Sequence, residues 1–266
     1  MSGSITFVGA GPGAADLITV RGKRVLDAAD VVIYAGSLVD ERLLDGSRAE
    51  KYNSAGMDFD AVMDVMIQAW NEGKQVVRLH TGDPAMYGAV GEQFRALDER
   101  GIPYEVVPGV SSVFAAAAAL KTEFTMPGVS QTAILTRDAG RTPVPDGEEL
   151  TGLAAHGSTL CLFLSVGNMR SVTDKLLAAG RPPETPAAVV YRAGWENQQI
   201  VRGTVADIAE RVREAGIRRQ AIVIVGDVLN RMGGMSLLYD RNFAHGYRRK
   251  NSFTGRSAVF ALTSAG

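Results

Sequence analysis

The sequence has little cysteine and little histidine. Cys161 is the single cysteine in 266 residues, so no disulfide can form within the chain. Its apolar neighbours in STLCLFLS favour a small buried side chain over a reactive thiol. The three histidines, His80, His156 and His245, show no metal-binding spacing with one another, and we expect no metal held by protein ligands.

Long apolar runs are also missing, as is an excess of charge of either sign. No stretch reaches the roughly 18 apolar residues of a membrane span, and no basic segment precedes an apolar one at the N-terminus. We therefore expect a cytoplasmic protein without a membrane partner. Lys plus Arg (28) balances Asp plus Glu (29), so the composition gives no reason to expect a nucleic acid as partner.

Hydrophobic residues (46%) and glycine (30 residues) are plentiful, and the length allows two small domains or one large one. In the first half, apolar strand-like runs alternate with amphipathic helix patterns. The strand-like runs cover residues 5–11, 31–39, 75–83 and 104–109, and the helices cover about 17–30, 58–73 and 91–100. In the second helix, Val62, Val65, Met66 and Ala69 form one apolar stripe. This alternation predicts a mostly parallel sheet covered on both faces.

Beyond residue 120 the pattern changes to strands with fewer helices. Strand-like runs at residues 132–138, 158–165, 186–194, 197–204 and 221–229 accompany helix patterns at 168–180 and 205–216, each ending in a glycine. We predict a second α/β domain with a mixed sheet. The boundary is expected near 121–126, which gives domains at 1–120 and 121–231 and a tail at 232–266, where residues 257–263 could add a late strand.

The loop VGAGPGAADLIT follows the first strand. Gly9, Gly11 and Ala14 satisfy the G-x-G-x-x-G/A pattern of dinucleotide-binding turns. Two features argue against that function: Pro12 has no N–H to offer a pyrophosphate, and the second strand ends in YAG without an acid to hold a ribose hydroxyl. These residues alone leave both a nucleotide cradle and a turn without a ligand open.

Two further turns follow predicted strands. In HTGDPAMYG, Gly82 permits a close approach of the backbone, and Asp83 offers a carboxylate. In VPGVSSVFAAAAAL, Ser111 and Ser112 present hydroxyls beside a run of alanines, which close helix packing would also explain. Because ligands of open α/β sheets lie at the carboxyl ends of the strands, we expect the three turns to converge on one edge of the sheet.

Together, these ordered motifs resemble the S-adenosylmethionine-dependent tetrapyrrole (corrin and porphyrin) methylases. The resemblance runs from residue 5 to about 229, through VGAGPGAADLIT, ADVVIYAGSLV, TGDPAMYG, VPGVSS, LFLS, VRGT and AIVIVGDV. It implies two α/β domains with the methyl donor in the cleft between them, and a proline-bearing loop that shapes the site instead of binding phosphate. It also implies a homodimer, and the sheet edges of a strand-rich second half need to be covered.

Carried over position by position, the resemblance assigns the binding of S-adenosylmethionine to Pro12, Gly82, Asp83, Met86, Ser111, Ser112, Leu164, Ala193 and Ala221. Asp83 would lie at the amino-acid and ribose portion of the donor, and Ala221 would pack on its adenine. No residue is assigned as a catalytic base. The sulfonium is already activated, and correct positioning can contribute about 7–11 kcal/mol in favourable cases.

The second strand indicates which tetrapyrrole would be methylated. Uroporphyrinogen methylases usually read Tyr-Asp-Arg-Leu there, whereas here Tyr34 is followed by AGSL. This turn and NSAGM at residues 53–57 resemble the methylases acting on carbon 11 of precorrin-4; whether the substrate carries cobalt stays open. Cations for its carboxylates could come from Arg137, Arg170 and Arg192, or from the tail residues Arg241, Arg248, Arg249, Lys250 and Arg256, although a solvated tail is the simpler interpretation.

Several other functions stay open at this point. They are another corrin or uroporphyrinogen methylase, an rRNA or protein methylase of the same fold, a nicotinamide-dependent dehydrogenase, and a non-catalytic tetrapyrrole carrier. The net charge of −1 weighs against the RNA methylase, whose partner is a polyanion.

Overall fold

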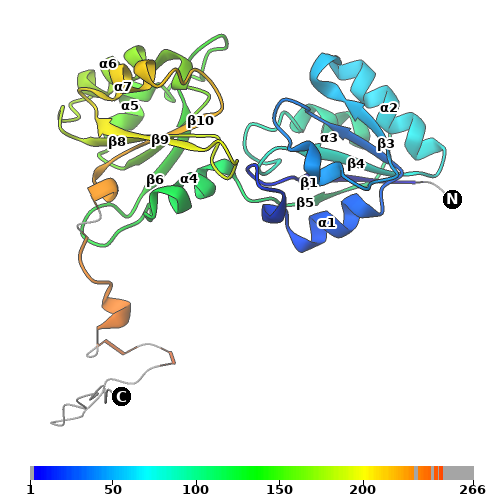
Figure 1. Ribbon diagram of the computed structural model, residues 1–266, viewed down its shortest axis with the longest axis horizontal. Helices are drawn as coiled ribbons and strands as arrows, with labels where there is room; N and C mark the ends of the chain where they lie inside the picture. Colours follow the sequence, from blue (N-terminus) through cyan, green and yellow to red (C-terminus); the bar gives the residue numbers. More distant parts are fainter. Residues whose placement is uncertain (1–2, 231–232, 241–242, 245, 248–266) are drawn as a thin grey trace, which may run out of the picture.

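The computed structural model describes residues 3–230, 233–240, 243–244 and 246–247. The chain forms two lobes, each built on a five-stranded sheet with helices packed against it (Figure 1). The predicted fold class, two α/β units in succession along the chain, is confirmed. Within the part of the chain described here, no helix is long and apolar enough to cross a membrane.

The first sheet is entirely parallel, with the strand order β3-β2-β4-β1-β5. Its strands are β1 (Ser4–Gly9), β2 (Val31–Tyr34), β3 (Glu50–Asn53), β4 (Gln75–His80) and β5 (Tyr104–Val107), and its helices are α1 (Val20–Asp27), α2 (Phe59–Asn71) and α3 (Gly91–Asp98). Because β1 lies between β4 and β5, the turns that follow these three strands are neighbours at one edge of the sheet.

Successive residues of each parallel strand pack into separate cores on the two faces of this sheet. Phe7 of β1 packs with side chains of α2 and α3, whereas Val8 packs with Leu26 of α1. On α2, the predicted apolar stripe is buried at Val62 and Met66. Helices therefore cover both faces, as the near-continuous apolar runs predicted.

The second sheet is mixed, with the order β6-β7-β10-β8-β9, in which β6 and β7 are parallel and the other pairs antiparallel. Its strands are β6 (Ala133–Arg137), β7 (Thr159–Phe163), β8 (Pro186–Tyr191), β9 (Gln199–Thr204) and β10 (Ala221–Val225). The helices α5 (Leu150–Ala154), α6 (Met169–Ala178) and α7 (Ile208–Glu214) cover one face. The glycines predicted to end α6 and α7, Gly180 and Gly216, have left-handed φ values of 82° and 69°.

The alanine-rich helix α4 (Ser112–Leu120) packs on the other face of the second sheet. Figure 1 shows it beside β6, and Val113 and Ala116 share a core with Cys161 of β7. Cys161 is thus a buried small side chain, and burial raises the pKa of its thiol to about 12. Since α4 packs with the second sheet, we propose that the domain boundary lies before this helix, near residues 108–111.

The tail still contacts the second lobe at Gly234, whose N–H donates to the Pro127 carbonyl at 2.9 Å. Figure 1 shows the short helix η6 (Leu237–Tyr239) standing apart from both lobes. The expected late strand at residues 257–263 lies outside the described residues, as do the tail cations Arg241, Arg248, Arg249, Lys250 and Arg256. The predictions made for them stay predictions.

Candidate active site

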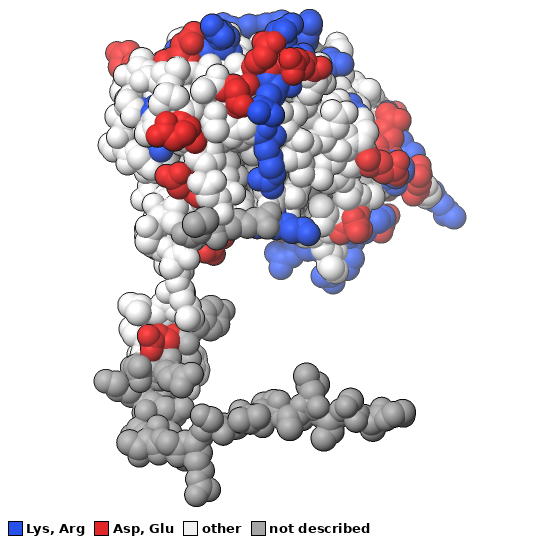
Figure 2. Space-filling view, turned by 60° about the vertical axis from the view of Figure 1, so that its left-hand side comes forward, with Lys and Arg blue, Asp and Glu red and all other residues white. Residues whose placement is uncertain are grey.

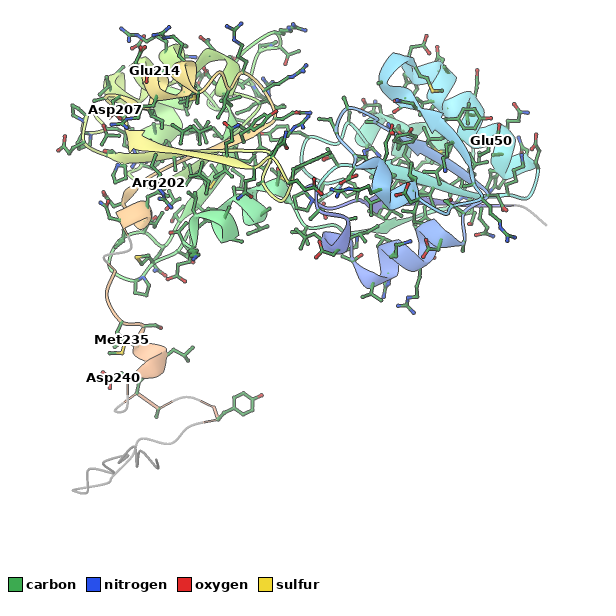
Figure 3. All side chains as sticks on the ribbon, in the orientation of Figure 1. Glu50, Arg202, Asp207, Glu214, Met235 and Asp240 are labelled. Carbon is green, nitrogen blue, oxygen red and sulfur yellow. The ribbon has the colours of Figure 1, made fainter. Side chains whose placement is uncertain are left out.

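A cavity of about 340 Å³ lies between the two lobes. The first lobe lines it with the turns after β1, β4 and β5, and the second with residues at the end of β7, after β8 and at the start of β10. Side chains of both lobes meet in this region in Figure 3, whereas Glu50 and Asp207 lie away from it. The cavity brings together all the residues assigned to the donor: Pro12, Gly82, Asp83, Met86, Ser111, Ser112, Leu164, Ala193 and Ala221.

Backbone contacts between glycines hold the first lobe's turns together. The Gly82 N–H donates to the Gly11 carbonyl at 2.7 Å, and the Gly11 N–H donates to the Gly82 carbonyl at 3.2 Å. A Cβ atom on Gly109 would lie 2.1 Å from the Gly82 carbonyl oxygen, so a larger residue does not fit there. The three turns thus form one packed edge, as their positions after strands predicted.

The carboxylate of Asp83 binds the backbone of these same turns. Its Oδ2 accepts from the Gly109 N–H and its Oδ1 from the Ala85 N–H, both at 2.8 Å. These bonds tie the turn after β4 to the turn after β5. Among the described residues that line the cavity, Asp83 is the only acidic one, whereas the basic ones are Arg192, Arg218 and Arg219.

The opening loop is not built as a phosphate cradle. The Ala10 N–H donates to the His80 carbonyl at 2.7 Å, and the Gly11 N–H is bound to Gly82. Pro12 has no N–H, and the helix that follows is the three-residue η1 (Ala15–Leu17). Two backbone donors of the turn are therefore already used and a third is absent, which argues against pyrophosphate binding and weakens the dehydrogenase alternative.

At the end of β7, Leu164 has a left-handed φ of 55° and is 74% exposed. The neighbouring Ser165 is buried, and its hydroxyl donates to the Phe163 carbonyl at 2.7 Å while accepting from the Asp138 N–H at 2.8 Å. A left-handed leucine costs about 1–2 kcal/mol, so this hydroxyl compensates for strain. The result is a leucine that lines the cavity instead of packing in the core.

After β8 and before β10, two more residues of the cavity wall have left-handed backbones. Arg192 has φ 45° and Gln220 has φ 56°, and the Arg192 Nε donates to the Gln220 Oε1 at 2.8 Å. The Arg192 N–H also donates to the Gln220 carbonyl at 2.9 Å. These bonds hold the buried Ala193 and Ala221 in the wall of the cavity.

Of Arg137, Arg170 and Arg192, the proposed arginines that the structure describes, only Arg192 lines this cavity. Arg137 donates to the backbone carbonyl of Thr142 at 3.1 Å and so braces its own loop. Arg170 lines a second cavity of about 530 Å³, which shares Val166, Gly167 and Arg218 with the first. The two cavities are therefore neighbours on the second lobe.

Sequence reasoning missed several residues of the cavity wall. Trp195, Gln220, Arg218 and Arg219 also line it and lie outside the motifs, and Tyr87 lines it from within the TGDPAMYG motif, where the sequence assigned it no role. A conformational signal links two of them, because Tyr87 and Gln220 are non-glycine residues with positive φ, which are uncommon and concentrate at functional sites. That signal is visible only in the backbone.

Apart from its arginines, the described part of the wall has two titratable groups: the Asp83 carboxylate, which accepts two backbone hydrogen bonds, and the Tyr87 phenol, whose pKa is raised by burial. His80 precedes the turn after β4 but is buried in the sheet, and burial, followed by the charge of Arg78, lowers its pKa to about 3. Within the described residues, no group of three His, Cys, Asp or Glu side chains could hold a metal ion. The cavity can bind and orient molecules, and positioning is what its residues offer chemically.

The chain is similar in sequence to proteins of one known family. Residues 4–209 match the family model described as tetrapyrrole (corrin/porphyrin) methylases. A protein of Methanocaldococcus jannaschii, named cobalt-precorrin-4 C(11)-methyltransferase, is 53% identical over 93% of this chain and 96% of its own.

Solved structures show the same likeness. A cobalt precorrin-4 methyltransferase has a TM-score of 0.83 and 49% identity, covering 85% of this chain and 95% of that one. A uroporphyrin-III C-methyl transferase from Thermus thermophilus, complexed with S-adenosyl homocysteine, has a TM-score of 0.75 and 31% identity, covering 86% of this chain and 100% of that one.

Proposed function

The chain belongs to the tetrapyrrole (corrin/porphyrin) methylases, and from that premise we propose that it transfers a methyl group from S-adenosylmethionine to carbon 11 of precorrin-4, or of its cobalt form, in cobalamin biosynthesis. The observation that carries the proposal is the convergence of all the donor residues, drawn from both sheets, on one cavity. The protein is a methyltransferase, like the relatives that share about half of its residues.

The cavity fits a donor of this size and chemistry. Its volume of about 340 Å³ lies in the range of small-molecule sites. The opening loop offers no phosphate cradle, and S-adenosylmethionine has no phosphate; when bound, it supplies a methyl group on a positively charged sulfur. Asp83 places the one carboxylate of the described wall in the cavity, which favours a cationic ligand. Its backbone bonds hold that carboxylate in place.

The small residues of the second lobe would form the surface on which the donor's adenine packs. Ala193 and Ala221 are buried and line the cavity on either side of the Arg192–Gln220 pair. Leu164 presents an exposed apolar side chain to the same space. We assign these three residues to donor binding, and no residue of the described wall to acid–base catalysis.

Cations at the cavity would hold the carboxylates of the tetrapyrrole. Arg192, Arg218 and Arg219 line it, and guanidinium groups bind carboxylates in two-point geometry. The cationic character is local, because the face seen in Figure 2 carries both basic and acidic groups. This distribution fits a small anionic substrate better than a nucleic acid.

The two segments that indicated precorrin-4 are bonded to each other. The Gly36 N–H donates to the Asn53 Oδ1 at 3.1 Å, and the Ser54 hydroxyl donates to the Tyr34 carbonyl at 3.2 Å. A Cβ on Gly36 would lie 2.2 Å from the Asn53 amide nitrogen. We propose that Ala35 and Gly36, which carry no charge, form a floor on which the tetrapyrrole ring lies.

The direct test offers precorrin-4 and uroporphyrinogen III side by side to the purified protein with methyl-labelled donor. We expect methylation of precorrin-4 at carbon 11, located by mass spectrometry and NMR. Methylation of uroporphyrinogen III alone would refute the substrate and leave the family standing. Methylation of precorrin-4 at another carbon would show that the floor selects the ring and not the site.

An Ala35→Asp variant tests the floor itself. Its carboxylate would have to be desolvated against the ring, so we expect the KM for precorrin-4 to rise at least tenfold. Ala35→Ser, which adds a hydroxyl without a charge, is the matched control and should change KM less than threefold. Equal effects of the two substitutions would argue against a charge-sensitive floor.

We also propose that the protein works as a cytoplasmic homodimer. The edge strands of the second sheet, β6 and β9, carry the exposed apolar side chains Leu135 and Ile200. Covering such edges is a common reason for association. Sedimentation at micromolar concentration should give twice the chain mass of 28.2 kDa, and a stable monomer would contradict the proposal.

A further inference from the structure

Two hydrogen bonds join the lobes across the cavity. The indole Nε1 of Trp195 donates to the Pro12 carbonyl at 2.9 Å, and the Gln220 Nε2 donates to the Ser37 carbonyl at 2.7 Å. In both, a side chain of the second lobe binds the backbone of a first-lobe loop. An ion pair between Arg42 and Glu196 adds a third connection.

Arg192 connects these two bonds. Its Nε donates to the Gln220 Oε1 at 2.8 Å, and its guanidinium carbon lies 5.1 Å from the centre of the Trp195 ring, within the range of a cation–π interaction. The result is a continuous chain of contacts, Ser37–Gln220–Arg192–Trp195–Pro12, which we call the clasp. All its members except Ser37 line the cavity.

The opening loop is shaped to receive the tryptophan. A Cβ atom on Gly13 would lie 2.2 Å from the Trp195 Cδ1, so any larger residue would displace the ring. On the other side of the contact, a Cβ on Gly194 would lie 3.4 Å from the Pro12 Cγ. That is an ordinary van der Waals distance, so it is the missing side chain of Gly13 that lets the two loops approach where the Trp195–Pro12 bond forms.

We propose that Trp195 is a positioning residue for the methyl donor, and that it acts by fixing the opening loop of the first lobe against the second. The inference rests on the proposed function, because it takes the cavity between the lobes as the donor site. With the clasp formed, Gly82 and Asp83 of the first lobe and Ala193 and Ala221 of the second line one cavity.

The first test removes the hydrogen bond and keeps an aromatic ring. Trp195→Phe should raise the Kd for S-adenosylhomocysteine, measured by calorimetry, about fivefold to tenfold, the worth of one hydrogen bond. Trp70→Phe is the matched control, since the Trp70 Nε1 has no hydrogen-bond partner and Trp70, a residue of α2, packs against the first-lobe core and does not line the cavity. Its Kd should stay within twofold of that of the unmodified protein.

A double-mutant cycle tests whether Gly13 acts through the ring. Gly13→Ala should weaken donor binding at least tenfold in the unmodified protein, and less than twofold in a Trp195→Ala background, where there is no ring to displace. In the Trp70→Phe protein the remaining tryptophan is Trp195, so its fluorescence should change on donor binding. A merely structural role would lower the melting temperature without these two signatures.

The outcomes distinguish failure of the clasp proposal from failure of the proposed function on which it rests. An unmodified protein that does not bind S-adenosylhomocysteine would overturn the proposed donor and the clasp together. Normal binding by the unmodified protein with unchanged affinity in Trp195→Phe would overturn the clasp alone. So would a Gly13→Ala effect that persists in full in the Trp195→Ala background.

Discussion

The two lobes build one cavity by different means. The first lobe brings its turns together with glycines, whose backbones touch directly at Gly11, Gly82 and Gly109, and Tyr87 adds a left-handed non-glycine residue to its side of the wall. The second lobe lines the same cavity with non-glycine residues in left-handed conformations, Leu164 and Arg192 among them, held by side-chain hydrogen bonds. Glycine adopts such backbones without strain, whereas other residues need compensating bonds.

The two lobes should therefore be sensitive to different kinds of substitution. In the first lobe, adding a single carbon atom at a glycine should be the most damaging change. In the second, removing a hydrogen bond that offsets backbone strain should be enough to misplace a residue of the cavity wall while the lobe stays folded.

The largest effect is expected for Gly109→Ala. The new Cβ would lie 2.1 Å from the Gly82 carbonyl oxygen and 2.8 Å from the Gly9 Cα, both of them backbone atoms that cannot rotate away. We expect the free energy of unfolding to fall by at least about 3 kcal/mol, measured by urea denaturation. Gly152→Ala, a helix position with open space around it, should be neutral or stabilising.

Gly82→Leu comes next. A Cβ at Gly82 has room, with the Ser112 N atom nearest at 3.6 Å, but the leucine side chain would extend into the donor cavity. Affinity for S-adenosylhomocysteine should fall at least about 100-fold, or about 2.7 kcal/mol. Gly82→Ala controls for the left-handed φ of 61° and should cost far less affinity. Unchanged affinity in the leucine variant would remove Gly82 from the donor site.

A pH effect should distinguish the lobes. The pKa of His80 in the folded first lobe is about 3, against about 6.5 in an unfolded chain, so unfolding takes up a proton between these values. Neutral His80 makes its full contribution to the free energy of unfolding above pH 6.5. This contribution is lost as the pH falls, by about 2 kcal/mol by pH 5.

Amide hydrogen exchange can locate this loss. At pH 5 the free energy of opening should fall in β4 relative to β10, and His80→Phe should abolish the difference. The exposed His156 supplies the control, because His156→Gln should leave the difference between β4 and β10 unchanged. Equal acid sensitivity of both sheets would contradict the assignment to His80.

The smallest effect is expected for Ser165→Ala. Loss of the hydroxyl that bonds Phe163 and Asp138 should release Leu164 from its left-handed conformation and raise the donor Kd about fivefold. Ser165→Thr keeps a hydroxyl and should restore most of the affinity. Thr159→Val removes a buried hydroxyl bond at the other end of β7 and should lower stability without changing Kd.

Much of the fold could be predicted because each buried strand or helix shows its pattern of apolar residues within a short stretch of sequence. The apolar runs of both sheets stand out, except for β3, whose sequence EKYN is largely exposed and has no apolar pattern to detect. The five-residue α5 is too short to show a helical period. The boundary is difficult to place because α4 adjoins the first sheet in sequence and packs on the second.

The sequence predicts the first lobe's side of the site better than the second lobe's side. Glycine and proline motifs point to the turns of the first lobe because tight turns need particular residues. In contrast, the left-handed backbones of Leu164, Arg192 and Gln220 follow from tertiary contacts and leave no local signal. Trp195 binds a carbonyl 183 residues away in sequence, and a contact of that kind depends on how the lobes meet.

A crystal structure of the protein with S-adenosylhomocysteine tests the central claim most directly, that both lobes build the donor site together. We predict the ligand in the cavity between the lobes, in contact with Gly82 and Ser111 from the first and with Leu164, Ala193 and Ala221 from the second. A ligand seated in the neighbouring cavity at residues 166–170 and 209–218, or held by one lobe alone, would contradict the account.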